Sequence, residues 1–331
     1  MLNKFIEKFI RLLNEKYQNR IRSFGIVGPY ARNQQTKFSD VDLYMITKQI
    51  NPFFEWKIKK KFFECFRDCK GREVSLLIAS PTIFKKPDLM FFEYTNSGKV
   101  LFGEKIKPIP IERISRFEAF RNIIYRSCFF LEQFEVKNGK LQLKKNIKKE
   151  LFLYNYSKVI QCVEEVCLLL TKEYVADNFK RSMLIKGNVF AKQIPNFIKE
   201  HQKIHLFKYE NLIPKDFSKE AYTRKAFFYL QRIYEILFKE LFDCKNLDCR
   251  KFNKIKAPFP SYIGTRLFFT LNWLKRTKQI KVHLFSEPFV CLTKKFIQFV
   301  IDFNSGKSLK RELLEEILNY WKCAGWFYYY V

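Results

Sequence analysis

The sequence predicts an α+β fold in which a small mixed sheet with its own helices comes first and an all-α helical bundle follows. Short β-type runs bounded by glycine or polar turns lie in the first third of the chain. Farther along, apolar residues recur at helical spacing. Residues 105–110, KIKPIP, form a rigid connector between the two patterns. We therefore expect a first domain over residues 1–110 and a second over residues 111–331.

The first domain is expected to alternate helices with strands. Apolar residues at helical spacing between Leu2 and Leu13 predict an amphipathic helix. Asn51 and Pro52 predict the start of a second helix, which Gly71 ends. A third helix, interrupted near residue 87, is expected over 81–94. Four short runs predict strands: 24–27, 41–46, 73–79 and 99–102.

The second domain is expected to be helical almost throughout, which favours a bundle. Residues 113–136 predict one long helix, and residues 137–149 predict a basic loop or hairpin tip around Gly139. Further helices are expected over 151–174, 217–242, 262–275, 289–303 and 309–321.

The charge balance indicates a polyanionic partner. The 331 residues carry 62 Lys and Arg against 33 Asp and Glu, a net charge of +29. Such an excess attracts nucleic acid first and an anionic membrane surface second, although a lysine-rich source organism would explain part of it. We expect RNA as the partner and no membrane. Candidate phosphate contacts are Lys59, Lys60, Lys61, Lys144, Lys145, Lys148 and Lys149, together with residues 250–256.

The compartment is expected to be cytoplasmic. The first residues carry charges throughout their apolar pattern, unlike a signal peptide, and no apolar run is long enough to span a bilayer. Nine cysteines without a regular framework indicate a reducing environment. His201 and His205 lack the neighbouring Glu of a zinc-binding helix, so a zinc site is not expected.

Residues 24–46 form the stretch with the clearest chemistry. An apolar run ends at Gly28, and a second run begins after Asp40. In an extended strand Asp40 and Asp42 share one face while Val41 and Leu43 share the other. Paired carboxylates suit Mg²⁺, or Mn²⁺ in its place, and a glycine lets backbone N–H groups approach a phosphate. The alternative is an ordinary surface turn whose acids are solvated.

The complete pattern resembles the signature of the polymerase-β superfamily of nucleotidyltransferases. The matching residues are Gly28, Ala31, Arg32, Ser39, Asp40, Asp42 and Leu43. The resemblance implies an enzyme that binds a nucleoside triphosphate, ATP by expectation, and transfers the nucleoside monophosphate to an acceptor. It places the metal on Asp40 and Asp42, which are also catalytic. It places the nucleotide against Gly28, Pro29, Arg32 and Ser39.

Three positions depart from the family pattern. Pro29 stands where the family has Ser and so lacks both a hydroxyl and a backbone N–H. Asn33 replaces the second glycine, and Ser75 stands where the family has a third carboxylate. Serine is a poor metal ligand and cannot act as a general base. Glu73, two residues earlier and therefore on the same face of a strand, is our candidate for the third catalytic acid.

These observations leave three functions open. The leading one is a nucleotidyltransferase acting on RNA, with the acceptor end of a tRNA as one candidate. The second is transfer onto a protein side chain, as in the antitoxin-like minimal members of the superfamily. The third is a nucleic-acid-binding protein that keeps the fold but has lost turnover, because Pro29 and Ser75 alter the site. The sequence gives no indication of oligomeric state.

Overall fold

The computed structural model describes residues 2–37, 39–49, 51–67, 74–85, 87–243 and 288–324. It contains two compact units, and the expected α+β class is confirmed. Among the described residues, the first unit comprises the chain up to Ser115 together with Val175–Asn178, and the second comprises Arg116–Tyr174 and residues 179–243 and 288–324. Glu73, the basic stretch 250–256 and the expected helix over 262–275 lie outside the described residues.

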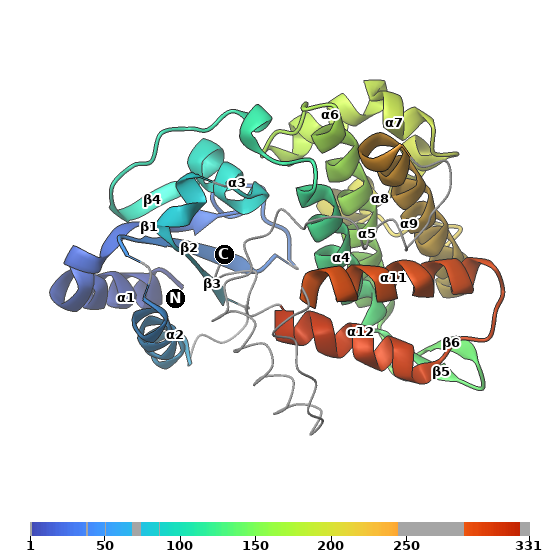
Figure 1. Ribbon diagram of the computed structural model, residues 1–331, viewed down its shortest axis with the longest axis horizontal. Helices are drawn as coiled ribbons and strands as arrows, with labels where there is room; N and C mark the ends of the chain where they lie inside the picture. The colour runs from blue at the N-terminus through green and yellow to red at the C-terminus, as the bar shows by residue number, and fades with distance from the viewer. Residues whose placement is uncertain are drawn as a thin grey trace. The chain divides into compact units, whose positions relative to one another are not determined.

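The first unit is built on a four-stranded sheet of order β3-β2-β1-β4 (Figure 1). Strands β2 and β3 are parallel, whereas β1 pairs antiparallel with both β2 and β4. The parallel pair requires a crossover connection, which α2 supplies. The elements are α1 Leu2–Tyr17, β1 Ile21–Val27, β2 Val41–Thr47, α2 Pro52–Phe66, β3 Val74–Ala79, α3 Leu89–Ser97 and β4 Lys99–Gly103, with short 3-10 turns at Gln18–Arg20, Pro81–Phe84 and Ile111–Arg113.

Helices α1 and α2 cover one face of this sheet. Phe9 of α1 and Phe62 of α2 are both buried and pack edge to face, with ring centroids 5.6 Å apart. The same core takes Leu43 of β2. Tyr44, the next residue, contacts Tyr94 of α3 with ring centroids 4.8 Å apart. Because side chains alternate along a strand, even-numbered residues of β2 lie on the α3 face.

The start of α2 is the one expected from sequence. Asn51 is the N-cap, and its side-chain oxygen accepts a hydrogen bond from the Phe54 backbone N–H at 3.0 Å. Pro52 occupies the first turn, where a missing N–H costs nothing.

The second unit is a helical assembly around α5 (Figure 1). The side chains of α5 are buried on nearly all sides of the helix. Helices α4, α8 and α9 pack against α5, and α11 packs against α9 and α12. The elements are α4 Glu118–Leu131, β5 Phe134–Lys137, β6 Lys140–Leu143, α5 Lys149–Leu170, α6 Asn178–Gly187, α7 Val189–Lys192, α8 Phe197–Glu210, α9 Lys219–Phe242, α11 Pro288–Asn304 and α12 Arg311–Ala324.

The expectation of one long helix over 113–136 is wrong. Helix α4 ends at Leu131, and a β-hairpin formed by β5 and β6 follows. Its two-residue turn is Asn138 and Gly139, with φ of 50° and 71°. Two consecutive positive φ values match the right-handed twist of a hairpin, and Asn-Gly adopts them readily. The basic hairpin tip expected around Gly139 is therefore confirmed.

Charged side chains are buried inside this helical unit. Glu165 accepts two bonds from Arg126, each 2.8 Å long, and lies 3.2 Å from Arg181. His201 Nε2 is 3.0 Å from Glu164 Oε1. Burial alone would raise the pKa of Glu164, but the hydrogen bond and charge of His201 and the Arg181 guanidinium hold it below its usual value. These contacts satisfy charges that would be costly to bury alone.

In the described part of the chain, no helix combines the length and the apolar character needed to cross a bilayer.

Candidate active site

Asp40 and Asp42 lie at the entry of β2. Asp40 directly precedes the strand and Asp42 is its second residue, and both are partly exposed. Val41 and Leu43 are fully buried. This alternation is that of an extended segment, so the two carboxylates share one face of the strand. Tyr44, which contacts α3, lies on the same face. The expected juxtaposition of the two acids therefore agrees with the burial pattern.

Ser75 lies beside Asp42 on the neighbouring parallel strand. The two residues are register partners, and Ser75 Oγ donates a hydrogen bond of 2.7 Å to Asp42 Oδ1. A hydroxyl donor thus occupies the position at which the family pattern has a third acid. The sequence could not reveal this bond, because it depends on the register between two strands joined through α2. Glu73, the candidate third acid, lies outside the described residues, so its role stays a prediction.

Gly28 brings the backbone against Asp42 from the other neighbouring strand. Its φ is +75°, and a Cβ built there would lie 3.0 Å from Asp42 Oδ2. The turn continues with a 3.2 Å bond from the Ala31 N–H to the Gly28 carbonyl. Asn33 has φ 57°, the left-handed conformation that asparagine tolerates better than other side chains. Asn33 therefore adopts a backbone conformation that glycine also adopts readily.

The side chain of Arg32 is bound to α3. Its Nη1 donates to Glu93 Oε2 of α3 at 3.0 Å and to Ser97 Oγ at 3.3 Å. The side chains of Arg32 and Glu93 are only 7% and 8% exposed. The guanidinium charge is thus already engaged by a carboxylate, and its contact with nucleotide phosphates stays a prediction. The pairing with Glu93 carries no signal in the sequence, since the two residues are far apart along the chain.

Ser39 holds the loop that leads into β2. It is buried, and its Oγ accepts a 2.9 Å hydrogen bond from the Thr36 N–H. The Ser39 N–H in turn donates to the Thr36 carbonyl at 3.1 Å. This reciprocal turn fixes the approach of Asp40 to the strand.

The donor set agrees with a hard divalent cation. Mg²⁺ takes one or two carboxylates and leaves its remaining positions to water and phosphate oxygens. Asp40 and Asp42 supply two such carboxylates beside a glycine turn whose Cβ-free backbone leaves space at Asp42. Within the described ranges there is no group of three or more His, Cys, Asp or Glu residues that could enclose a metal. Two carboxylates match a cation whose remaining positions are taken by water and phosphate oxygens.

The lysines proposed to contact nucleic acid differ in their surroundings. Lys59 is buried in α2, and its burial lowers its pKa to about 8 although Glu55 opposes this. Burial raises the pKa of Glu55 to about 7. A buried ammonium group is poorly placed for a phosphate backbone. Lys60 is exposed, and Lys61 is paired with Glu64 at 2.6 Å.

The lysines between β6 and α5 are more accessible. Lys144, Lys145 and Lys148 are exposed, and Lys144 Nζ donates to the Glu132 carbonyl at 2.7 Å. Lys149 Nζ lies 4.7 Å from the centre of the Phe217 ring. Contact of this segment with nucleic acid stays a prediction.

Comparison with known proteins supports a nucleotidyltransferase, the class of protein that the small mixed sheet and its carboxylate pair also indicate. No protein-family model matches the chain. The chain is 35% identical over 80 residues to a protein of Methanocaldococcus jannaschii named "Putative protein adenylyltransferase". The match covers 23% of this chain and 74% of that relative. The chain belongs to the same nucleotidyltransferase family as this relative.

Proposed function

We propose that the protein transfers a nucleoside monophosphate, AMP from ATP in the first instance, to an acceptor in the manner of the polymerase-β superfamily. The observation that carries the proposal is the paired placement of Asp40 and Asp42 beside the left-handed turn at Gly28. The name of the archaeal relative supports adenylyl transfer in particular.

The reaction makes simple demands on the chain. An acceptor hydroxyl forms a bond to the α-phosphorus while the bond to the bridging β-oxygen breaks, and pyrophosphate leaves. A divalent cation held by Asp40 and Asp42 would neutralise charge on the phosphate oxygens. The Ser75 hydrogen bond keeps the Asp42 carboxylate in one orientation. The acceptor proton needs a base, a role that we assign to Glu73.

The first candidate acceptor is RNA. The net charge of +29 supports a polyanionic partner. Eighty matched residues are too few to span both units, so the similarity to the relative does not extend to the whole chain. Acceptor choice can therefore differ between the two proteins.

The second candidate acceptor is a protein side chain. It is favoured by the printed name of the relative, which describes a protein adenylyltransferase. The hydroxyl chemistry is the same for both acceptors, so the active-site geometry does not separate them.

A labelling experiment tests the proposal. The full-length protein is incubated with each α-labelled NTP, Mg²⁺ or Mn²⁺, and either total RNA or total protein. We expect label to move from ATP to RNA. Label in protein instead would select the second acceptor. Absence of label in both, from protein that still binds RNA, would show that the fold is kept without turnover.

Matched variants connect the labelling to the site. Asp42→Asn should abolish transfer, whereas Glu7→Gln, which removes an equal charge from an exposed position on α1, should leave it unchanged. Glu73→Gln tests the third acid. If Glu73→Gln keeps metal-dependent transfer while Asp42→Asn loses it, the role given to Glu73 is wrong.

A further inference from the structure

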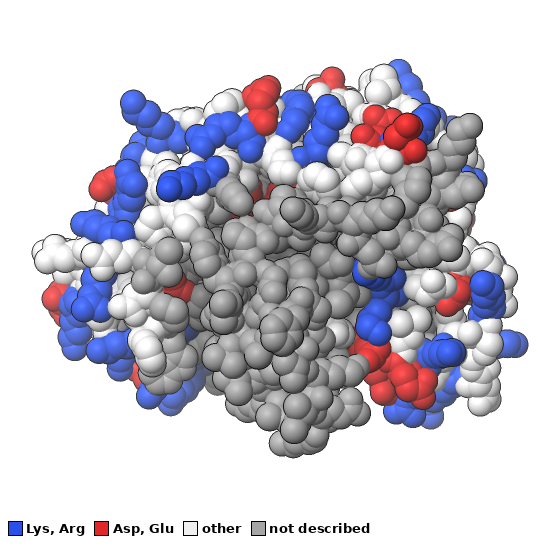
Figure 2. Space-filling view, in the orientation of Figure 1, with Lys and Arg blue, Asp and Glu red and all other residues white. Residues whose placement is uncertain are grey.

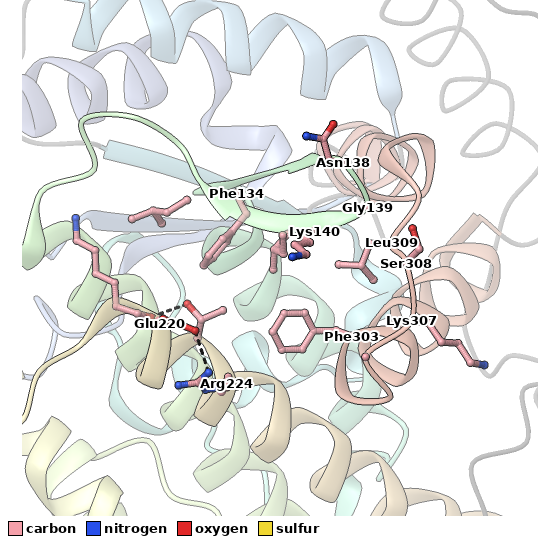
Figure 3. A pocket seen from close by; sticks show the side chains of 15 residues that line it. Phe134, Asn138, Gly139, Lys140, Glu220, Arg224, Phe303, Lys307, Ser308 and Leu309 are labelled. Carbon is pink, nitrogen blue, oxygen red and sulfur yellow. Dashed lines mark hydrogen bonds and ion pairs between the residues drawn. The ribbon is translucent and has the colours of Figure 1, made fainter.

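The second unit contains an open cavity of about 650 Å³ between the β5–β6 hairpin, the first turns of α9 and the loop after α11 (Figure 3). Positive side chains come from each wall: Lys140, Lys219, Arg224 and Lys307. Of the described residues that line the cavity, only Glu220 is acidic. We call this cavity the hairpin groove.

The walls of the groove are fastened to one another. The Leu309 N–H donates to the Gly139 carbonyl at 2.8 Å, which ties the loop after α11 to the hairpin tip. Gly139 has φ +71°, and a Cβ there would lie 2.2 Å from Ser308 Oγ, so another residue would be strained and would force the Ser308 hydroxyl to move. Lys219 Nζ donates to the Ile147 carbonyl at 2.7 Å and joins α9 to the segment after β6. The groove is therefore a preformed feature of the unit.

The charges in the groove exceed what the protein neutralises. Glu220 pairs with Arg224 at 2.9 Å within one helix, but both side chains are largely exposed, so this pairing is weak and leaves guanidinium N–H groups for a phosphate. The exposed Lys307 side chain lies 3.8 Å from Asp302, which is a long and weak pairing. Lys140 on β6 is exposed and forms no ion pair among the described residues. Like charges gathered in a concave site repel one another until an anion enters.

The groove also carries an aromatic surface. Phe303 is partly exposed at the end of α11, and its ring stacks on the buried Phe227 with centroids 4.0 Å apart. Figure 3 shows the Phe303 ring below the hairpin that carries Phe134 and Lys140. A ring backed by a buried ring has a fixed orientation. Proteins that bind single-stranded nucleic acids combine cations with such rings. The cations contact phosphates, and a base stacks on the ring.

The net charge of the protein does not by itself identify the groove as a binding site. Figure 2 shows Lys and Arg spread over the surface of both units on the face drawn, so the overall excess does not mark a site by itself. The exposed Lys144, Lys145 and Lys148 directly follow β6, and the Lys219 bond to Ile147 keeps their segment beside the first turn of α9. A strand lying in the groove could continue along these lysines.

We propose that the hairpin groove binds a single-stranded segment of RNA, holding phosphates with Lys140 and Arg224 and stacking one base on Phe303. The inference deepens the RNA branch of the proposed function. It concerns binding alone, however, and can be measured without nucleotide or metal.

The test uses the full-length protein and a fluorescent single-stranded oligoribonucleotide of mixed sequence, followed by anisotropy at several salt concentrations. Lys140→Gln with Arg224→Gln removes two positive charges from the groove. Each lost phosphate contact lowers the slope of log K against log salt by about 0.7 and weakens binding about fivefold at about 0.1 M salt. The double variant should therefore bind about 25-fold more weakly, with a slope reduced by about 1.4.

Control variants separate the groove from general charge. Lys192→Gln with Lys199→Gln removes two exposed charges from α7 and α8, outside the groove. This variant should bind nearly as the wild type does. Equal weakening in the two double variants would overturn the proposal.

Phe303→Leu tests the stacking surface, because leucine fills much of the packing space but offers no ring. It should weaken binding about tenfold while leaving the salt slope unchanged. Unchanged affinity in this variant would refute the stacking assignment. AMP and inorganic phosphate serve as competitors: displacement of the strand by AMP at equal molar concentration would overturn the choice of a strand over a mononucleotide. Asp42→Asn should bind the strand normally, so loss of transfer and loss of groove binding are independent results.

Discussion

Replacing Gly28 by alanine tests the link between the turn and the carboxylate pair. Gly28 has φ +75°, and the added Cβ would lie 3.0 Å from Asp42 Oδ2. Two effects are expected from one methyl group. The left-handed backbone strains any L-residue with a Cβ, and the contact displaces the Asp42 carboxylate.

The strain has a calculable magnitude. A left-handed residue other than glycine costs about 1–2 kcal/mol. In a unit of this size that corresponds to a melting temperature lower by about 5 to 15 °C. Displacement of a reacting or ligating group by about 1 Å costs about 100-fold in rate. A Cβ 3.0 Å from Asp42 Oδ2 requires the carboxylate to move by only a few tenths of an ångström. We therefore expect Gly28→Ala to fold, to melt earlier and to lose about 10-fold or less in kcat/KM for nucleotidyl transfer.

Two other glycines separate these effects. Gly306 has φ +67° with no atom within 4 Å of an added Cβ, so Gly306→Ala should show the strain without the contact. Gly187 is helical with equally open surroundings, and Gly187→Ala should be neutral or slightly stabilising. Thermal unfolding followed by circular dichroism measures the first effect and the transfer assay measures the second.

The outcome that refutes the reasoning is specific. If Gly28→Ala loses stability as Gly306→Ala does but keeps wild-type transfer, Asp42 does not depend on the turn. If Gly28→Ala loses neither stability nor transfer activity, the close approach of the Gly28 backbone to Asp42 is wrong.

Three further predictions follow from side-chain contacts. Ser75→Ala should raise the Mg²⁺ concentration needed for half-maximal transfer by about 10- to 100-fold, because Asp42 loses its orienting hydrogen bond. Ser75→Thr keeps a hydroxyl and should titrate with Mg²⁺ as the wild type does. Equal Mg²⁺ titrations for Ser75→Ala and the wild type would contradict this. Arg32→Met should destabilise the first unit by about 3–5 kcal/mol in urea because the buried Glu93 carboxylate loses the Arg32 guanidinium, and adding Glu93→Leu should recover most of the loss; a single variant as stable as wild type would argue against the buried pair. Burial, together with nearby guanidinium groups, lowers the pKa of Lys208 to about 7, so the unfolded chain holds the extra proton between about pH 7 and 10 and stability should rise across that range. Lys208→Met should flatten this rise in pH-dependent unfolding, and an unchanged profile would exclude Lys208 as its source.

The sequence predicted the first unit well where local chemistry decides structure. Asn51 and Pro52 mark the start of α2 because capping depends on neighbouring residues only. The alternation around Val41 likewise predicted that Asp40 and Asp42 share a face. The bond from Ser75 and the pairing of Arg32 depend on strand register and on packing against α3, which local patterns do not contain.

The hairpin after α4 shows a different limit. Phe134 and Val136 continue the apolar character of the preceding helix, so periodicity alone extended that helix too far. The turn signal was present as Asn138-Gly139. Helices α6, α7 and α8 were not separately predicted; α6 and α8 present weak amphipathic patterns that resemble loops or longer helices.

The short segment Val175–Asn178 determines how the chain can be divided. It connects α5 to α6 yet belongs to the first unit, where Gln34 Nε2 donates to Asp177 Oδ2 at 2.8 Å and Gln34 Oε1 accepts from the Asn178 N–H at 3.2 Å. A protein shortened to residues 1–110 would lack both partners of Gln34. The chain therefore contributes to the first unit twice, and the complete unit exists only after α5 has been synthesised.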